Sequence, residues 1–399
     1  MTRFKIVIGA NFGDEGKGLM ADHFAAEASE QNRSCLGVCS NGGAQRGHTV
    51  VTPEGRRHVF HHFASGTMAG ADTWLPGYFI LNPIMFMDEY EELQVYGPRV
   101  FLSQDCPVTT PFDMITNQII EQHRGTARHG SCGVGIWETL VRDGARLKEM
   151  MDMTDDELRR YLLDCKEYMK MRLGTLGIEE IPEGWRDIVD DMRLIENYIA
   201  DFRSMLRLST LAEADIMAEY DTVVFEAGQG LLLDRNRKEY GCNTTPSNTG
   251  LRNPAELIRE YLHSEKGSHI FGINSEVDIE VCYVTRTYLT RHGAGRFDQE
   301  CPKAEINPNM VDLTNVPNPY QGTIRYGKLD EKALIRRIRE DFDSERFPYG
   351  IKARRTLAVT HTNEYYTTLE NEADYLFCGE TRLGRAESAD NWQDYRVDA

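Results

Sequence analysis

An apolar segment that runs directly into a glycine-rich loop is the feature that most constrains the fold of this chain. Residues 4–18 read FKIVIGANFGDEGKG, a strand-like run followed by three glycines and a lysine. A loop of this kind predicts a strand of a parallel sheet, with backbone amides at its carboxyl end that bind phosphate. The first element of an α/β fold is therefore expected at the N-terminus.

Two features of the loop differ from an ordinary phosphate-binding loop. No Ser or Thr follows Lys17, and two carboxylates, Asp14 and Glu15, stand inside the loop. A carboxylate is compatible with a triphosphate if it ligates Mg²⁺, or if it acts as a base toward a substrate beside the phosphates. The alternative is a glycine-rich turn that Asp14 caps. The loop alone leaves both interpretations open.

The composition excludes several classes of partner. The 399 residues carry a formal charge of −18, which disfavours nucleic acid and anionic membranes as partners. The apolar run at the N-terminus is too short for a signal peptide, and no stretch reaches the length of a membrane span. The nine cysteines are scattered, which is typical of reduced thiols. We expect a cytoplasmic protein.

Short apolar runs alternate with helical patterns, which predicts an α/β protein with a mostly parallel central sheet flanked by helices. Helix-start signatures stand at Thr110 and Thr154, each followed three residues later by an acid. We expect a single domain over residues 1–399, with a helical insertion over residues 150–215. The expected strands are 5–10, 35–39, a hairpin near 48–63, 99–103, 221–227, 280–288, 356–360 and 374–378.

Five polar, glycine-containing or amide-containing segments directly follow predicted strands. They read GDEGKG, SNGGAQRGHT, GQG, HTNE and GET. Ligands of open α/β sheets bind beyond the carboxyl ends of the strands, so these segments are expected to converge on one cleft. The histidine of the second segment, His48, is then a candidate to stabilise charge on a transferring phosphoryl group, although a lone histidine is usually structural.

With these motifs assembled, the chain resembles the adenylosuccinate synthetase family. The resemblance rests on GDEGKG (13–18), GHT (47–49), FEAGQG (225–230), TTPSNT (244–249), TRHGAGRF (290–297) and CGET (378–381). It implies a P-loop-related fold. It also implies a ligase that joins a 6-oxopurine nucleotide to L-aspartate, driven by a nucleoside triphosphate with Mg²⁺ as cofactor.

The resemblance gives the carboxylate in the loop a role. Asp14 is expected to remove the proton from N1 of the purine, so that O6 attacks the γ-phosphate. Asp14 and the carbonyl of Gly47 are the expected Mg²⁺ ligands. His48 then stabilises the developing charge, and Gln229 completes the catalytic set.

The resemblance also implies three groups of binding residues. The expected triphosphate site comprises Gly13, Asp14, Glu15, Gly16, Lys17, Gly18, Gly47, His48, Thr49, Asn363 and Gly379. The expected purine monophosphate site comprises Asp14, Asn41, Gln45, Gly130, Ser131, Arg142, Gln229 and Thr245. The expected aspartate site comprises Gly322, Thr323 and Arg325. Arg142 matches an arginine that the family sends across a twofold axis, which implies a homodimer.

Three departures from the family pattern bear on the substrates. Where enzymes that use GTP carry a TKxD element, this chain has His361, Thr362 and Asn363, and Asn suits an adenine edge at least as well as a guanine. The arginine-rich aspartate loop, TTGRxRR in style, retains only Arg325. Phe12 replaces the usual Trp.

These departures resemble a phage-type branch of the family, the 2-aminoadenylosuccinate (N6-succino-2-amino-2′-deoxyadenylate) synthases, which use dGMP with ATP or dATP in making diaminopurine DNA. The first alternative is an ordinary enzyme that uses IMP and GTP. The second is a nucleotide-binding regulator without turnover, which has less need of both a base and an acid.

Overall fold

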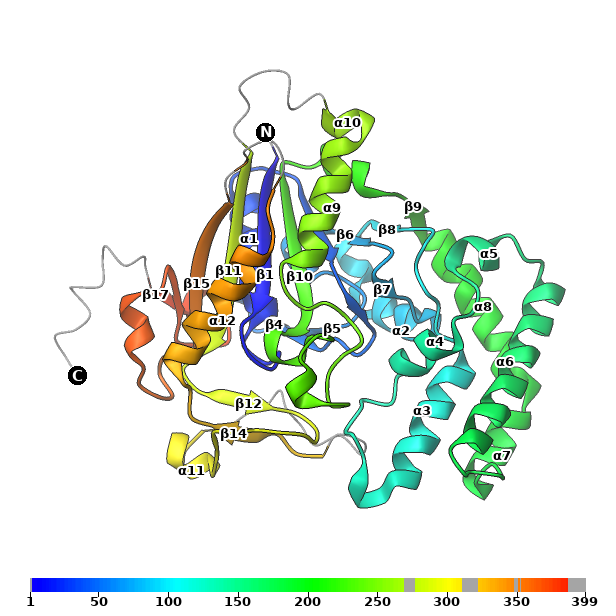
Figure 1. The fold of residues 1–399 in the computed structure, drawn as a ribbon. Coiled ribbons are helices and arrows are strands. Elements are labelled where there is room, and N and C mark those ends of the chain that lie inside the picture. Colours follow the sequence, from blue (N-terminus) through cyan, green and yellow to red (C-terminus); the bar gives the residue numbers. More distant parts are fainter. Residues whose placement is uncertain (1, 269–276, 311–321, 348–350, 352, 387–399) are drawn as a thin grey trace.

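The glycine-loop strand lies near the middle of a ten-stranded sheet (Figure 1). The computed structural model describes residues 2–268, 277–310, 322–347, 351 and 353–386. Strand β1 (Arg3–Gly9) is hydrogen-bonded on one side to β11 and on the other to β10. In spatial order the strands are β17 (Arg385–Ala386), β16 (Tyr375–Phe377), β15 (Ala353–Thr360), β11 (Asp278–Arg286), β1, β10 (Thr222–Gly230), β2 (Cys35–Cys39), β6 (Asp72–Leu75), β8 (Val100–Leu102) and β9 (Ser209–Leu211).

The strand pairing confirms the predicted fold class. Every neighbouring pair of the large sheet is parallel except β16 and β17. Strand β2 covers the predicted residues, and the other predicted sheet strands are found within a few residues of their expected bounds. Strands β6 and β9 were not predicted, because each is short and β6 begins with a polar pair, Asp72 and Thr73.

Alternating residues of the central strands bury two opposite faces of the sheet. One face, with Val7, Val224 and Cys282, packs against α1 (Lys17–Glu30). The other face, with Ile6 and Phe225, packs against α9 (Arg252–His263) and α12 (Glu331–Ser344). A parallel sheet covered on both faces requires such continuous apolar strands. The core is therefore three layers deep, with α9 and α12 in front of the strands in Figure 1.

A helical region packs beyond one edge of the sheet, at the right of Figure 1. The predicted capping boxes at Thr110 and Thr154 are both formed and start α3 and α6. The helices begin earlier than expected, and residues 209–211 form β9 rather than helix. That the region is an insertion within one domain stays a prediction. Its helices are α2 (Pro83–Leu93), α3 (Pro111–Arg124), α4 (Ile136–Arg142), α5 (Leu147–Met151), α6 (Asp155–Thr175), α7 (Glu183–Asp190) and α8 (Met192–Leu208).

Three smaller sheets and two short helices complete the described elements. The predicted hairpin is formed by β4 (His48–Val51) and β5 (Arg57–Phe60). Strand β3 (Gly42–Gly43) pairs with β7 (Phe79–Ile80), and β14 (Arg325–Gly327) pairs with β12 (Leu289–Arg291) and β13 (Glu300–Cys301). The short helices are α10 (Glu265–Ser268) and α11 (Lys303–Ile306). Within the described ranges, the helices are all too short or too polar to cross a membrane.

Candidate active site

A cleft with a volume of about 270 Å³ lies at the carboxyl ends of the central strands. It brings together four of the five predicted segments, GDEGKG, GHT, HTNE and GET. The fifth segment adjoins it, because the side-chain oxygen of Gln229 lies 3.0 Å from where a Cβ atom at Gly13 would stand. The predicted convergence of the loops is confirmed. The lining residues are Gly13, Asp14, Gly16, Lys17, Gly18, Leu19, Gly47, His48, Thr49, Val51, Arg286, Tyr288, Met310, His361, Asn363, Glu364, Cys378, Gly379 and Glu380.

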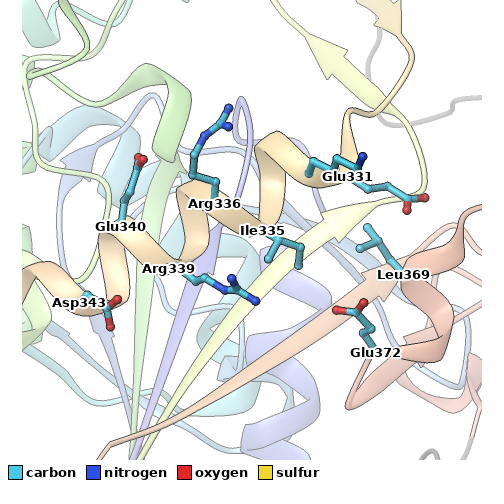
Figure 2. A pocket seen from close by; sticks show the side chains of 9 residues that line it. Glu331, Ile335, Arg336, Arg339, Glu340, Asp343, Leu369 and Glu372 are labelled. Carbon is cyan, nitrogen blue, oxygen red and sulfur yellow. The ribbon is translucent and has the colours of Figure 1, made fainter.

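A larger and more open groove, of about 790 Å³, runs along the outer side of α12 (Figure 2). Ile335 and Arg339 of α12 face Leu369 and Glu372 across it. It shares no lining residue with the cleft, and side chains of both charge signs line it. We place the candidate active site in the cleft, where strand ends and helix α1 meet, rather than in this groove.

The glycine loop and the GHT segment form one compact unit, which we call the cradle (residues 13–18 and 47–49). Gly16 adopts a left-handed conformation with φ of 94° and starts helix α1 at Lys17. A Cβ atom at Gly18 would lie 3.0 Å from the carbonyl oxygen of Thr49 and 3.1 Å from Cβ of His48. Glycine at position 18 therefore lets the GHT segment lie against the N-terminus of α1, which is an anion-binding position.

Lys17 is a buried cation at the centre of the cradle. Its side chain is fully buried, and Nζ donates a hydrogen bond to the carbonyl of Gly13 at 2.5 Å. Burial lowers the pKa of Lys17, and the nearby carboxylates of Glu15 and Asp14 oppose this shift. Lys17 nevertheless lines the cleft, so its amino group lies beside the space that a ligand would enter.

The two carboxylates of the loop face different ways. Oε1 of Glu15 accepts the backbone N–H groups of Gly13 (2.7 Å) and Asn11 (3.2 Å), so this side chain braces the loop from inside. Burial raises the pKa of Glu15, and the charge of Lys17 opposes that shift. Asp14 instead lines the cleft, with a quarter of its side chain exposed. Of these two residues only Asp14 lines the cleft, and the predicted contact of Glu15 with a triphosphate has no counterpart in the cleft lining.

Two positioning contacts hold Asp14. Its backbone carbonyl accepts a hydrogen bond of 2.5 Å from Nε of Arg286, and its Oδ2 lies 3.9 Å from Nε2 of His292. Arg286 ends strand β11 and lines the cleft. The sequence reasoning did not identify Arg286, and nothing in its local pattern marks it as a site residue.

His48 is tied to a buried carboxylate that the sequence reasoning also missed. Its Nδ1 lies 2.6 Å from Oε1 of Glu226, and Nη2 of Arg46 lies 2.8 Å from Oε2 of the same carboxylate. Burial lowers the pKa of His48 to about 4, although the charge of Glu226 opposes the shift. Burial alone would raise the pKa of Glu226, but His48 and Arg46 outweigh it and hold that pKa low. Both partners stand inside motifs already recognised, GGAQRGHT and FEAGQG.

Gln229 reaches the cradle through a strained backbone. Its φ is 81°, and the register between β1 and β10 shifts just before it, so that Gly9 pairs with Gly230. A left-handed conformation costs a residue other than glycine about 1–2 kcal/mol. Such strain is typical of functional sites, and the shift turns Gln229 toward Gly13.

Four of the residues predicted to bind the purine monophosphate, Gly130, Ser131, Arg142 and Thr245, lie on segments beside the cradle that we call the rim (residues 129–142, 244–251, 291–300 and 322–327). Gly130 and Gly293 are so close that a Cβ atom at Gly130 would lie 2.6 Å from Cα of Gly293. Ser131 accepts a hydrogen bond from Asn117, and the half-buried Thr245 donates its N–H to Leu233. The structure thus brings the HGSCGVG and TRHGAGRF loops into contact.

Two side-chain amides predicted to bind the purine nucleotide differ in whether their polar atoms already have hydrogen-bond partners. Asn41 is buried, and both ends of its amide bind the backbone of Gly228, at 2.7 and 2.9 Å. Both amide atoms of Gln45 lack a hydrogen-bond partner within the described residues. Gln45 is therefore the amide with capacity to bind a ligand, whereas Asn41 holds the FEAGQG turn in shape.

Arg142 does not extend from the protein surface as the dimer prediction requires. Its Nε donates to Asp113 at 2.8 Å, its Nη2 donates to Asp113 and to the carbonyl of Val108, and its Nη1 donates to Tyr161. Only 5% of its side chain is exposed. The sequence could not reveal this, because Asp113 stands 29 residues away on another helix. The structure places this arginine inside its own chain.

Arg325, the one arginine kept in the predicted aspartate loop, also has an internal partner. Its Nε and Nη2 bind both carboxylate oxygens of Glu300, at 2.8 and 2.6 Å, and its Nη1 donates to the carbonyls of Gly293 and Gly295. Gly322 and Thr323 precede it on the same segment. Arg325 therefore holds a carboxylate in a geometry that a substrate carboxylate would also adopt.

The HTNE segment presents a carboxylate as well as an amide to the cleft. Asn363 is exposed, and the neighbouring Glu364 accepts a hydrogen bond of 2.5 Å from the hydroxyl of Tyr288. His361 has a φ of 58°, which turns the chain at the end of β15. The carboxylate absent from the expected TKxD position is therefore present one residue later, but already bonded.

Helix α12 supports both the cradle and the rim. Arg337 donates to the carbonyl of Ala10 (2.7 Å) and to the side chain of Asn11 (2.5 Å), just before the glycine loop. One turn later, Asp341 accepts the N–H of Leu251 at the end of the TTPSNTG segment, and the hydroxyl of Tyr283. Burial raises the pKa of Asp341 to about 6.

The sequence profile of the adenylosuccinate synthetase family matches residues 6–315, more than three quarters of the chain. The chain belongs to the adenylosuccinate synthetase family.

Relatives within the adenylosuccinate synthetase family are distant. The synthetase of Gloeothece citriformis is 28% identical over 317 residues, which are 77% of this chain and 64% of that protein. The synthetase of Psychrobacter cryohalolentis is 27% identical over 351 residues, 85% of this chain and 74% of that protein. The matched part of the chain thus spans less than two thirds of the length of the first relative.

Two solved structures share the fold of this adenylosuccinate synthetase family member. Fully ligated adenylosuccinate synthetase from Plasmodium falciparum has a TM-score of 0.63 and 18% identity, covering 89% of this chain and 76% of that chain. Cyanophage S-2L succinoaminodeoxyadenylate synthetase (PurZ), bound to dGMP and dATP, has a TM-score of 0.61 and 14% identity, covering 97% of this chain and 96% of that chain. At these identities the likeness concerns the fold alone.

The donors that a Mg²⁺ ion of this family requires are available in the cleft. Mg²⁺ prefers hard oxygen ligands and is usually held by one or two protein groups together with substrate phosphates. The accessible carboxylate of Asp14 and the exposed Gly47 both line the cleft. The described residues contain no cluster of three or more His, Cys, Asp or Glu side chains arranged for a metal.

Proposed function

We propose that this protein is a purine nucleotide–aspartate ligase that forms a C–N bond at C6 of a 6-oxopurine. The observation that carries the proposal is the position of Asp14, an accessible carboxylate that lines a cleft together with a buried lysine and a glycine-rich helix N-terminus. A base beside a phosphate-binding loop is the arrangement that this chemistry requires, because the amide-like O6 must be activated within reach of a phosphate.

In the proposed reaction, Asp14 takes the proton from N1 of the purine, and O6 forms a bond to the γ-phosphorus as the nucleoside diphosphate leaves. Lys17 and the amides at the start of α1 offset the charge on the phosphates. The amine of L-aspartate then attacks C6, and phosphate leaves with O6. Gln229, next to Gly13, is proposed to contact the purine nucleotide.

His48 is proposed to stabilise the charge on the transferring phosphoryl group. Its Nδ1 is committed to Glu226, which leaves Nε2 for the phosphate oxygens. The negative charge of a bound triphosphate favours the protonated ring, in which Nε2 is a donor. Asp14 and the carbonyl of Gly47 are proposed to hold Mg²⁺, which when bound neutralises charge on the β- and γ-phosphates.

The finer proposal is that the purine substrate is dGMP and the energy donor is ATP or dATP, which gives N6-succino-2-amino-2′-deoxyadenylate. Three observations support it: Asn363 stands exposed where a guanine-reading carboxylate is expected, the aspartate loop keeps one arginine, and the PurZ fold matches nearly the full length of both chains. Glu364 is already bonded to Tyr288, so Asn363 is the more available reader of the base.

The alternative is the reaction of IMP with GTP, which the names of the sequence relatives favour. One assay separates the two. Phosphate release is measured with dGMP or IMP, each combined with ATP, dATP or GTP, in the presence and absence of L-aspartate. We expect the highest aspartate-dependent rate with dGMP and ATP or dATP. A higher rate with IMP and GTP would overturn the finer proposal, and no aspartate-dependent release with any pair would overturn the ligase itself.

We also propose a homodimer, without the support of Arg142, which is paired inside its own chain. Analytical ultracentrifugation with and without the purine monophosphate tests it directly. A monomer under both conditions contradicts this proposal and leaves the ligase proposal unaffected.

A further inference from the structure

A fully buried arginine lies directly behind His48. The side chain of Arg46 has no exposed surface, and that of Glu226 has 1%. Nη2 of Arg46 lies 2.8 Å from Oε2 of Glu226 and 3.1 Å from Nδ1 of His48. The three side chains therefore form a closed triangle at the back of the cradle.

Packing alone does not account for an arginine in this place. Removing a guanidinium from water costs several kcal/mol, and a whole buried ion pair replaced by apolar residues of similar volume is often as stable or more stable. Within the described residues, Nε and Nη1 of Arg46 make no hydrogen bond, so that cost is only partly offset. The ring of Phe79, 5.9 Å from the guanidinium carbon, adds a weak cation–π contact. Stability alone therefore does not account for the buried pair of Arg46 and Glu226.

The hydrogen bonds of Glu226 indicate what Arg46 does. Oε1 receives Nδ1 of His48 and the hydroxyl of Ser65, whereas Oε2 receives Nη2 of Arg46 and the N–H of Ser65 at 3.2 Å. Arg46 thus fixes one oxygen of the carboxylate and, with it, the plane of the group. The other oxygen is then aimed at His48.

The stem of Arg46 is fixed as well. A Cβ atom at Gly228 would lie 3.0 Å from Cγ of Arg46, and Asn41 clamps the backbone of Gly228 from both sides. Glycine at position 228 leaves the room that the arginine stem occupies. The position of the guanidinium is thereby set by the FEAGQG turn, which also carries Gln229.

We propose that Arg46 is a positioning residue: it orients Glu226, which in turn fixes the ring of His48 with Nδ1 bonded and Nε2 directed to the phosphates. The expected effect on turnover rests on the proposed ligase function, whereas the expected orientation of the His48 ring does not. In this proposal Arg46 contacts no substrate and acts through Glu226 and His48.

The test compares three variants by steady-state kinetics with the best nucleotide pair. R46M keeps much of the side-chain volume but removes the charge, and we expect kcat to fall about 10- to 100-fold, the usual effect of losing a supporting contact. KM for the purine nucleotide and for aspartate should change little, because binding groups are untouched. R46K restores a cation near Glu226 and should recover part of kcat.

Lys5 offers a matched control, because it forms a buried ion pair with Glu280 at 2.6 Å on the same sheet, away from the cleft. K5M should lower thermal stability but leave kcat unchanged. If folded R46M also keeps the wild-type kcat, or if it loses only stability as K5M does, the proposal is overturned.

A second readout needs no turnover. ¹⁵N NMR of the His48 ring in the protein without ligands should show one tautomer with the proton on Nδ1 in the wild type and a mixture of tautomers in R46M. The same tautomer in both proteins would overturn the proposal, even if no substrate pair is turned over. If R46M does not fold, G228A, which presses a methyl group onto the stem of Arg46, is expected to give the same mixture, and a wild-type spectrum in G228A would overturn the proposal.

Discussion

The cradle and the rim lie beside the same cleft, but their charged side chains are held by different kinds of contact. In the cradle, glycine contacts and buried hydrogen bonds fix the backbone or side chains of Lys17, Asp14 and His48 beside the cleft, where the proposed triphosphate would bind. In the rim, the two arginines expected to bind substrate carboxylate or phosphate are each bonded to a carboxylate of the same chain. The cradle is ready for a ligand, whereas the rim must exchange partners to receive one.

This difference shows which kinds of prediction from sequence agree with the folded structure. Local motifs such as GDEGKG fix backbone geometry over a few residues, and their placement was predicted correctly. The partner of a long side chain depends on residues far away in the sequence. Rim arginines are therefore where a family resemblance is least secure.

The largest expected effect is that of D14N, which keeps the size of the side chain but removes the proposed base of the cradle. We expect turnover to fall by roughly 10³-fold, about 4 kcal/mol of transition-state stabilisation, with the fold intact. Single-turnover phosphate release and circular dichroism check this. E15Q is the matched control, since Glu15 braces the loop from inside and should cost less activity. Equal losses in the two variants would show that Asp14 is not the base.

The next largest effect concerns the rim. R142M leaves Asp113 buried without its partner, and we expect the free energy of unfolding to fall by about 3 kcal/mol. Urea denaturation measures this, with R186M, in an exposed ion pair, as a control that should change stability by less than about 1 kcal/mol. Wild-type stability combined with lost binding of the purine monophosphate would mean that Arg142 leaves Asp113 and reaches the ligand, as the sequence predicted.

The pH dependence of the free energy of unfolding should reveal the contribution of Asp341, which supports the rim from α12. Asp341 has a folded pKa of about 6, raised above its ordinary value of 3.8 by burial. The folded protein therefore binds this proton more tightly than the unfolded chain does. Its contribution is complete below pH 4 and is lost as pH rises to about 6, an effect of about 3 kcal/mol at most. D341N should flatten the stability profile between these pH values, and an unchanged slope would contradict this assignment.

The smallest effect tests partner exchange at Arg325. E300Q weakens the bidentate pair, and because this pair is partly exposed we expect KM for L-aspartate to fall only about two- to fivefold. E305Q, which breaks the exposed Lys328 pair near the same small sheet, should leave KM unchanged. A rise of KM in E300Q would instead indicate that Glu300 itself contacts the substrate amine.

Much of the fold could be predicted, because parallel strands buried on both faces show as apolar runs and the glycine loops mark their carboxyl ends. The strands at the far edge escaped prediction, since β6 and β9 have three or four residues and take their shape from their neighbours. In the site, Asp14, Lys17 and His48 were identified from motifs. Glu226, Arg46 and Arg286 were not, because their roles arise from contacts between distant strands.

Helix α12 connects the cradle and the rim through two of its side chains. Arg337 and Asp341 lie one turn apart on α12. Arg337 donates to the backbone just before the cradle, and Asp341 accepts from the backbone of the rim at Leu251. A shift of α12 along its axis would therefore displace the cradle and the rim together, and ligands bound at these two places are expected to influence each other through this shared support.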